Sequence, residues 1–294
     1  MKKQFLSLIF GLTALSAQAT TPLWLRDAQI SPDGTSIAFC YKGDIYTVST
    51  QGGNARQLTT QSSYECTPVW SPDSKKIAFA SDRDGNFDIF IMSADGGNAK
   101  RLTKNSVTEL PSAFTPDGKH VVFSAAIQDP AQSALFPTSA MSELYQVPVE
   151  GGRTRQIIAT PAEAVCYTKD GASFLYQDKK GFEDEWRKHH TSSVTRDIWL
   201  YDSKSGKHIN LTNIGGEDRD PVIAPDGNTV YFLSERKGGS MNVYQMSLKN
   251  PKDIKAVTSF KTHPVRFLSA SNKGQLCYTY DGEIFTLLGL PLAA

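Results

Sequence analysis

The sequence predicts an all-β fold, a six-bladed β-propeller whose sixth blade is incomplete. One four-part pattern recurs six times at intervals of 40 to 56 residues, and no segment shows the 3.6-residue periodicity of an amphipathic helix. A propeller blade of four short strands needs about that length. A single repeat cannot bury both faces of its sheet, so the copies must stack, and a ring gives every blade two neighbours.

Each copy begins with a tight turn related to Ser-Pro-Asp-Gly. The six turns start at Ser31, Ser71, Thr115, Thr168, Ala224 and, in a degenerate form, Ser271. In such a turn Pro presets φ, the Asp side chain bonds nearby backbone amides, and Gly supplies the positive φ. We therefore interpret the repeated Asp as a turn-capping residue and not as an acid-base group.

Two strands follow each turn, and a third is expected after the first five. The first is short and apolar, and it covers residues 37–39, 77–79, 121–123, 174–176, 230–232 and 276–278. The next reads polar, aliphatic, aromatic, any, aliphatic, and it covers residues 44–48, 88–92, 143–147, 197–201, 242–246 and 283–287. A more polar outer strand is expected at 56–59, 100–103 and 155–157, with its end preserved at 210–212 and 256–258.

Residues 1–19 read as a signal peptide that precedes the fold. Lys2 and Lys3 form a basic start, Phe5 to Leu15 is apolar, and Ala17-Gln18-Ala19 has small residues where signal peptidase acts. We expect cleavage after Ala19 and a location in the bacterial periplasm. The remaining chain has no second apolar run long enough to span a membrane.

The propeller is expected over residues 20–287, followed by an atypical apolar tail at 288–294. The sixth copy has three strands, and the Leu-rich tail stands where a Gly-Gly hairpin and an outer strand are expected. We interpret this as a truncated or frame-shifted end. An open sheet edge of this kind predicts self-association or poor solubility.

Charge and cysteine content exclude several classes of function. The 31 basic and 30 acidic residues leave a net charge of +1, which gives no electrostatic footprint for nucleic acid. Four cysteines, Cys40, Cys66, Cys166 and Cys277, lie in apolar strand-like runs with no metal or disulfide spacing. We expect them to be buried free thiols.

The repeat resembles the PD40-type, WD40-like blade found in TolB and in tricorn-type proteases. Gly43 to Val48, soon after the first turn, and the run Glu185 to Ser193 favour the N-terminal six-bladed propeller of tricorn-like, S41-type serine peptidases. The resemblance covers residues 22–287 and implies a scaffold or gate for peptides. The family's catalytic Ser and His belong to a part that this sequence does not include, so the resemblance assigns no catalytic residue and no enzyme activity to this chain.

A dense polar segment supplies the candidate binding residues. We expect it to form a pore-facing or partner-facing loop between the second and third strands of blade four, because loops on a rigid scaffold often carry binding. The candidates are Glu185, Trp186, Arg187, Lys188, His189 and His190. The alternative is a solvated insertion with local ion pairs that contribute little energy.

Metal, cofactor and hydrolase sites find no support in the sequence. His189 and His190 lack a third ligand at a suggestive spacing. Asp82 to Asp88 imitates the start of a calcium loop, but its twelfth position is Ser93 and a tight turn explains it better. The sequence has no G-x-S-x-G elbow, and we expect no cofactor.

The sequence thus favours a non-catalytic periplasmic propeller that binds peptides or a protein partner. The alternative is a TolB-like protein-interaction module of the cell envelope. A propeller that binds a small ligand or a glycan is a third possibility.

Overall fold

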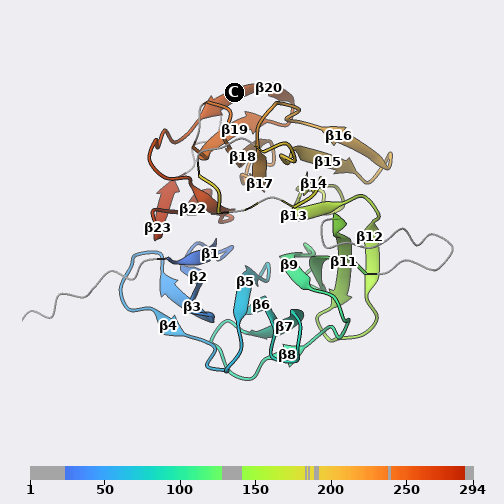
Figure 1. Ribbon diagram of the computed structural model, residues 1–294, viewed down its shortest axis with the longest axis vertical. Coiled ribbons are helices and arrows are strands. Elements are labelled where there is room, and N and C mark those ends of the chain that lie inside the picture. The colour runs from blue at the N-terminus through green and yellow to red at the C-terminus, as the bar shows by residue number, and fades with distance from the viewer. Residues whose placement is uncertain are drawn as a thin grey trace, which may run out of the picture.

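Six antiparallel sheets follow one another along the chain and stand around a common axis (Figure 1). The computed structural model describes residues 24–127, 141–182, 184, 186–188, 192–237 and 240–288. These residues form 23 strands and no α-helix. The all-β propeller is therefore confirmed, while the expected signal peptide and the tail beyond Leu288 lie outside the described residues.

The first three blades contain four strands each, and the chain runs through each blade in order from one side of the sheet to the other. Their strands are β1 (Arg26–Ile30), β2 (Ser36–Tyr41), β3 (Asp44–Ser49) and β4 (Arg56–Gln57) in blade one, β5 (Glu65–Trp70), β6 (Lys76–Ser81), β7 (Asp88–Ser93) and β8 (Lys100–Arg101) in blade two, and β9 (Glu109–Phe114), β10 (His120–Ala125), β11 (Glu143–Pro148) and β12 (Arg155–Ile158) in blade three.

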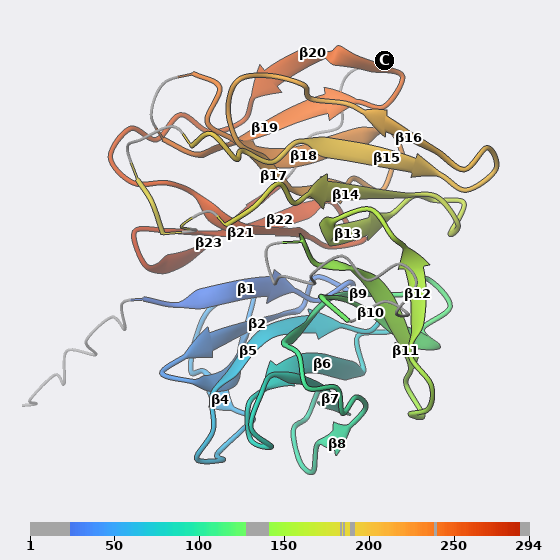
Figure 2. The same cartoon turned by 45° about the vertical axis from the view of Figure 1, so that its right-hand side comes forward.

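Blades four to six repeat this strand order. In Figure 2 they lie above blades one to three. Their strands are β13 (Ala162–Tyr167), β14 (Phe174–Asp178), β15 (Ile198–Asp202) and β16 (Lys207–Asn210) in blade four, β17 (Asp218–Ile223), β18 (Thr229–Ser234), β19 (Asn242–Ser247) and β20 (Asn250–Ala256) in blade five, and β21 (Arg266–Ala270), β22 (Gln275–Tyr280) and β23 (Glu283–Leu288) in blade six. The sixth blade has three strands in the described part of the chain, as expected for an incomplete blade.

The repeated turns adopt the expected conformation. Gly34 has φ +73°, and in blade two Ser74 takes the equivalent position with φ +60°. Asp33 accepts a hydrogen bond from the backbone N–H of Thr35 at 3.0 Å, and Asp73 does the same for Lys75 at 3.1 Å. The Ser31 hydroxyl donates to Asp33 and holds the pKa of that carboxyl below its usual range. The role of these aspartates as turn caps is confirmed.

An aromatic pair joins the second and third strands of every blade. Each pair consists of residues directly opposite in the ladder, with ring centroids 5.7 to 6.5 Å apart. The six pairs are Phe39–Tyr46, Phe79–Phe90, Phe123–Tyr145, Tyr176–Trp199, Phe232–Tyr244 and Tyr278–Phe285. Such pairs contribute about 0.5–1.5 kcal/mol each beyond the area they bury, so they fix the register of each blade.

Apolar clusters fill the gaps between neighbouring blades. Ala38 and Ile45 of blade one, for example, pack against Ile77 and Phe79 of blade two. The last gap is also closed, because the backbone N–H of Ile30 donates to the Ser269 hydroxyl at 3.0 Å, between blades one and six. The ring therefore closes by direct packing of its first and last blades.

The four cysteines are free thiols on strands, as expected. Cys40 and Cys277 are buried as predicted, but the prediction of burial is wrong for Cys66 and Cys166, which lie on innermost strands and are half-buried. Burial raises the pKa of Cys66 to about 12 and that of Cys166 to about 11. Thiols with such values are poor nucleophiles at neutral pH.

Candidate functional site

The innermost strands of all six blades surround a central channel. Its hollow has a volume of about 310 Å³. Every blade contributes to its wall, through Asp27, Thr67, Leu110, Ala164, Asp220 and Phe267 among others. This central hollow is lined by both charged and apolar groups.

Backbone strain is concentrated on this channel wall. Asp27, Thr67, Ala164, Asp220 and Phe267 have φ between +49° and +56°, in the left-handed region that non-glycine residues rarely adopt. Each lies at the irregularity where its innermost strand loses register with the next strand. These bulges cost roughly 1–3 kcal/mol each, and such strain commonly marks functional surfaces.

A long connection in blade four carries Trp186 to the end of this channel, where its ring lies 6.0 Å from that of Phe267, a residue of the channel wall. It joins β14 to β15, as the sequence predicted, whereas the corresponding connection in blade one consists of Lys42 and Gly43. Asp184, Trp186, Arg187 and Lys188 are described, and we call these residues the blade-four strap. The other candidates, Glu185, His189 and His190, lie outside the described residues.

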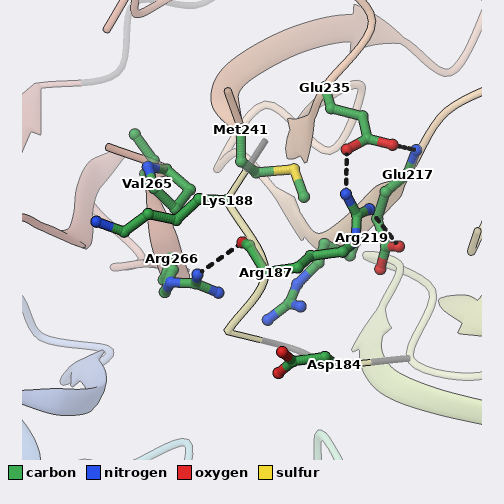
Figure 3. A pocket seen from close by; sticks show the side chains of 10 residues that line it. Asp184, Arg187, Lys188, Glu217, Arg219, Glu235, Met241, Val265 and Arg266 are labelled. Atoms are coloured by element: carbon green, nitrogen blue, oxygen red, sulfur yellow. Dashed lines mark hydrogen bonds and ion pairs between the residues drawn. The ribbon is translucent and has the colours of Figure 1, made fainter. Parts of the chain in front are cut away.

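Arg187 anchors the blade-four strap to blade five. Its guanidinium pairs with Glu235 at 2.7 Å and with Glu217 at 3.1 Å, and 6% of its side chain is exposed (Figure 3). Burial by itself lowers the pKa of Arg187, but hydrogen bonds to the two glutamates outweigh it and raise the pKa above its usual value. The alternative of a solvated insertion with local ion pairs is wrong for Arg187, because its own side chain is buried and its two partners are 30 and 48 residues away in the sequence.

The ion pairs continue from Arg187 into blade four. Glu217 also pairs with Arg196 at 2.6 Å, and Arg196 lies 3.5 Å from Glu163, which in turn pairs with Lys179. Burial by itself raises the pKa of Glu163, but the charges of Lys179 and Arg196 outweigh it and lower the pKa overall. Pairs of this kind are strongly destabilising to break, because a buried charge is left without compensation.

Trp186 connects the blade-four strap to the opposite side of the ring. Its indole lies beneath the guanidinium of Arg26 at 4.5 Å and that of Arg266 at 5.1 Å, so it contacts blades one and six. Arg266 also donates a hydrogen bond to the main-chain carbonyl of Arg187 at 3.1 Å (Figure 3). The strap thus bridges blades four, five, six and one.

Lys188 forms the last contact of the strap. Its ammonium lies 3.0 Å from Nδ1 of His263, whose Nε2 lies 3.3 Å from Asp281. An ammonium can only donate, so His263 accepts at Nδ1 and its Nε2–H faces the carboxylate. This chain of contacts holds the strap against the loop that enters blade six.

A pocket of about 390 Å³ lies beneath the strap at the junction of blades six and one. Trp24, Trp186 and Phe267 supply aromatic surface. Three cationic side chains, those of Arg26, Lys188 and Arg266, outnumber the carboxylate of Asp281 in the lining. The pocket can therefore hold an anionic group next to an apolar or aromatic one. Its residues do not form a paired nucleophile and base.

The remaining sequence candidates occupy ordinary structural positions. Asp82 to Asp88 forms the hairpin between β6 and β7, where Arg101 pairs with Asp84 and Asp88. His208 bonds the Tyr176 hydroxyl at 2.9 Å. In the described part of the chain, no group of three or more His, Cys, Asp or Glu residues is placed to hold a metal ion, and no helix is long and apolar enough to cross a membrane.

Sequence reasoning missed the partners of the strap, namely Arg26, Glu217, Glu235, His263 and Arg266. Two signals could have found some of them. Glu217 to Asp220 is a run of four charges at the start of a strand, and Ser234-Glu235-Arg236 repeats the form of Ser81-Asp82-Arg83 at the same place in another blade.

Comparison with known proteins places this arrangement in a family. The family model described as "Tricorn protease N-terminal beta propeller domain" matches residues 22–289. The chain belongs to this family. The tricorn N-terminal propeller assignment confirms the resemblance inferred from the repeat and from the blade-four segment.

Solved structures support the same propeller fold. The tricorn protease superposes with a TM-score of 0.74 at 22% identity, over 91% of this chain and 25% of that one. A putative TolB from Agrobacterium tumefaciens superposes with a TM-score of 0.67 at 16% identity, over 90% of both chains. The uncharacterized peptidase YuxL of Bacillus subtilis (strain 168) is 31% identical over 81 residues, 28% of this chain. The chain spans about a quarter of the tricorn protease and 11% of YuxL.

Proposed function

We propose that this chain is a non-catalytic, peptide-handling propeller of a tricorn-like peptidase, in which the blade-four strap controls access to the central channel. The observation that carries the proposal is the position of the strap, which contacts four blades around one mouth of the channel. The membership in the tricorn N-terminal propeller family supports a role next to a peptidase. The strained channel wall and the cationic, aromatic pocket support binding of an extended peptide.

Peptide passage requires the strap to move, and its contacts divide into a firm and a loose part. The Arg187 ion pairs are buried and firm. Trp186 is 44% exposed and is held by stacking on Arg26 and Arg266. Cation–π contacts at such exposed sites contribute about 0.5–1 kcal/mol each. The Trp186 end is therefore the part of the strap that opens.

The test measures the association rate of a labelled ten-residue peptide of mixed sequence by stopped-flow fluorescence. It compares the Trp186→Ala variant with the unsubstituted chain. The substitution frees the mouth and leaves the Arg187 pairs intact, so we expect the association rate to rise roughly tenfold. Arg56→Ala is the matched control, because Arg56 is 55% exposed on the rim and forms a surface pair with Asp95. An unchanged rate in Trp186→Ala would contradict gating, and cleavage of the peptide by the purified chain would contradict the non-catalytic role.

The alternative is a TolB-like interaction module, which the superposition over 90% of a TolB chain favours. It predicts that the purified chain retains an envelope protein and shows no affinity for peptides. We also propose that the chain works in the periplasm after cleavage behind Ala19. Cell fractionation and N-terminal sequencing of the mature chain test this, and a cytoplasmic chain that keeps Lys2 and Lys3 would contradict it.

A further inference from the structure

The indole of Trp186 lies in a subsite that other blades build. The guanidinium of Arg26 lies 4.5 Å from the ring and that of Arg266 lies 5.1 Å from it. The ring of Phe267, on the channel wall, lies 6.0 Å away by centroids. Arg26 belongs to blade one, whereas Arg266 and Phe267 belong to blade six. The strap of blade four thus inserts its indole into a subsite that the facing blades provide.

Both guanidiniums form hydrogen bonds that do not involve the indole. Arg26 donates to the hydroxyl of Tyr64, at the entrance to blade two. Arg266 donates to the main-chain carbonyl of Arg187 at 3.1 Å, and the buried ion pairs of Arg187 keep that carbonyl in place. The two cations therefore stay in position when Trp186 swings out, and the subsite keeps its shape.

Two other arginine–aromatic stacks of this chain are of a different kind. Arg83 lies 4.4 Å from the ring of Phe90, and Arg236 lies 5.1 Å from that of Phe232. Those rings belong to ladder residues that are 3% and 0% exposed, so they cannot leave their blades. Trp186 is a loop residue and is 44% exposed. It is therefore the exchangeable member of its stack.

The pocket of about 390 Å³ beneath the strap gives a ligand access to this subsite. Arg26, Trp186, Arg266 and Phe267 all line the pocket, and Trp24, 67% exposed, adds a further aromatic wall. A guanidinium is attracted to the face of an aromatic ring, most strongly to that of tryptophan. The subsite therefore favours an aromatic side chain over an aliphatic one.

We propose that Trp186 is a built-in surrogate for the ligand, and that its subsite binds an aromatic side chain of a peptide, Trp or Tyr, which displaces the indole. A peptide of this class replaces the cation–π contacts that the strap gives up, whereas an aliphatic peptide breaks them without replacing them. Because the strap gates the channel in the proposed function, on which this step rests, an aromatic peptide also opens the gate.

The first test uses a small probe, N-acetyl-5-fluorotryptophanamide, and fluorine NMR. Trp186→Ala leaves the subsite without its own indole, so the variant should bind the probe at least about fivefold more tightly than the unsubstituted chain does. N-acetyl-leucinamide should displace the probe from the variant at least about fivefold less effectively than N-acetyl-tryptophanamide. No binding of the probe to the variant at about 10 mM, or equal displacement by the two amides, would overturn the proposal.

Substitution of the two cations tests how the subsite selects its ligand. In the Trp186→Ala background, Arg26→Gln with Arg266→Gln should reduce the preference for the tryptophan amide to about twofold or less. Arg26→Gln alone keeps the hydrogen bond of Arg266 to the strap and should lower the preference at least about twofold. Arg56→Gln is the matched control, because this rim residue is 55% exposed, and it should change nothing. A preference that survives the loss of both Arg26 and Arg266 would overturn the proposal.

A peptide pair separates this subsite from gating itself. Two labelled ten-residue peptides differ only by Trp or Ala at one position, and both are followed by stopped-flow fluorescence. We expect Trp186→Ala to accelerate both, and the unsubstituted chain to bind the Trp peptide at least about fivefold more tightly. Equal acceleration with equal affinity would leave gating intact and overturn the aromatic subsite. Unchanged rates with a retained preference for Trp would contradict gating and support the subsite.

Discussion

Blades three and five start their innermost strands with a buried acid at the same register position, yet the two acids are compensated in different ways. Asp218 in blade five lies opposite Ser234 and pairs with Arg236 at 3.0 Å. Glu109 in blade three lies opposite Ala125, and Ile127 stands where blade five has Arg236. Burial raises the pKa of Glu109 to about 7, whereas Arg236 opposes burial and limits the pKa of Asp218 to about 6.

The acid is therefore a feature of the repeat, whereas the group that compensates its charge differs from blade to blade. Blade two follows blade five, since Arg83 pairs with Glu65 at 3.0 Å. Glu217, next to Asp218, is compensated by the blade-four strap through Arg187. The side-chain amide of Asn105 donates a hydrogen bond to Glu109. The neighbouring carboxylate of Asp88 raises the pKa of Glu109 further. In blade three, burial instead favours the protonated, uncharged form of Glu109.

The largest change in the free energy of unfolding is expected when Arg236 of blade five is replaced by an uncharged residue. Arg236→Leu leaves the Asp218 carboxylate buried without its partner, and should lower the free energy of unfolding by about 3–5 kcal/mol at pH 8. Urea denaturation measures this loss. The double variant Arg236→Leu/Asp218→Asn is the control, and it should recover most of the stability. A double variant as unstable as the single one would contradict the assignment.

A pH dependence should distinguish blade three. The folded pKa of Glu109 lies above its ordinary value of 4.5, so the native state binds the proton more tightly than the unfolded state between pH 4.5 and 7. Its contribution to stability is therefore complete below pH 4.5 and declines by roughly 3 kcal/mol as the pH rises through 7. Glu109→Gln should remove that decline, measured as unfolding free energy at pH 5 and pH 8.5. Identical pH profiles of the two chains would refute the interpretation.

The smallest effect is expected when blade three receives the arginine of blade five. Ile127→Arg places a guanidinium near Glu109 at the cost of apolar packing against its cluster, so the net gain at pH 8 should be roughly 1 kcal/mol. Carbon-13 NMR of the Glu109 carboxyl provides the sharper measurement. We expect its pKa to fall below 7, and an unchanged titration would show that the position is not equivalent to Arg236.

The sequence by itself determined the local and repeating features of this protein. The six turns and the order of strands in each blade were predicted, as were the three strands of blade six in the described part of the chain. Their hydrogen bonds and hydrophobic periods lie within a few residues of one another. The sequence also predicted that the segment around Trp186, Arg187 and Lys188 is a loop of blade four that carries candidate binding residues.

Tertiary structure alone decided what that loop contacts. Arg187 meets Glu217 and Glu235, which are 30 and 48 residues away, and its carbonyl accepts a bond from Arg266, 79 residues away. The strained positions on the channel wall, such as Phe267, likewise depend on how six bulged strands converge on one axis. Local sequence propensity cannot predict these contacts, because the side chains come together and are removed from water only when the ring closes.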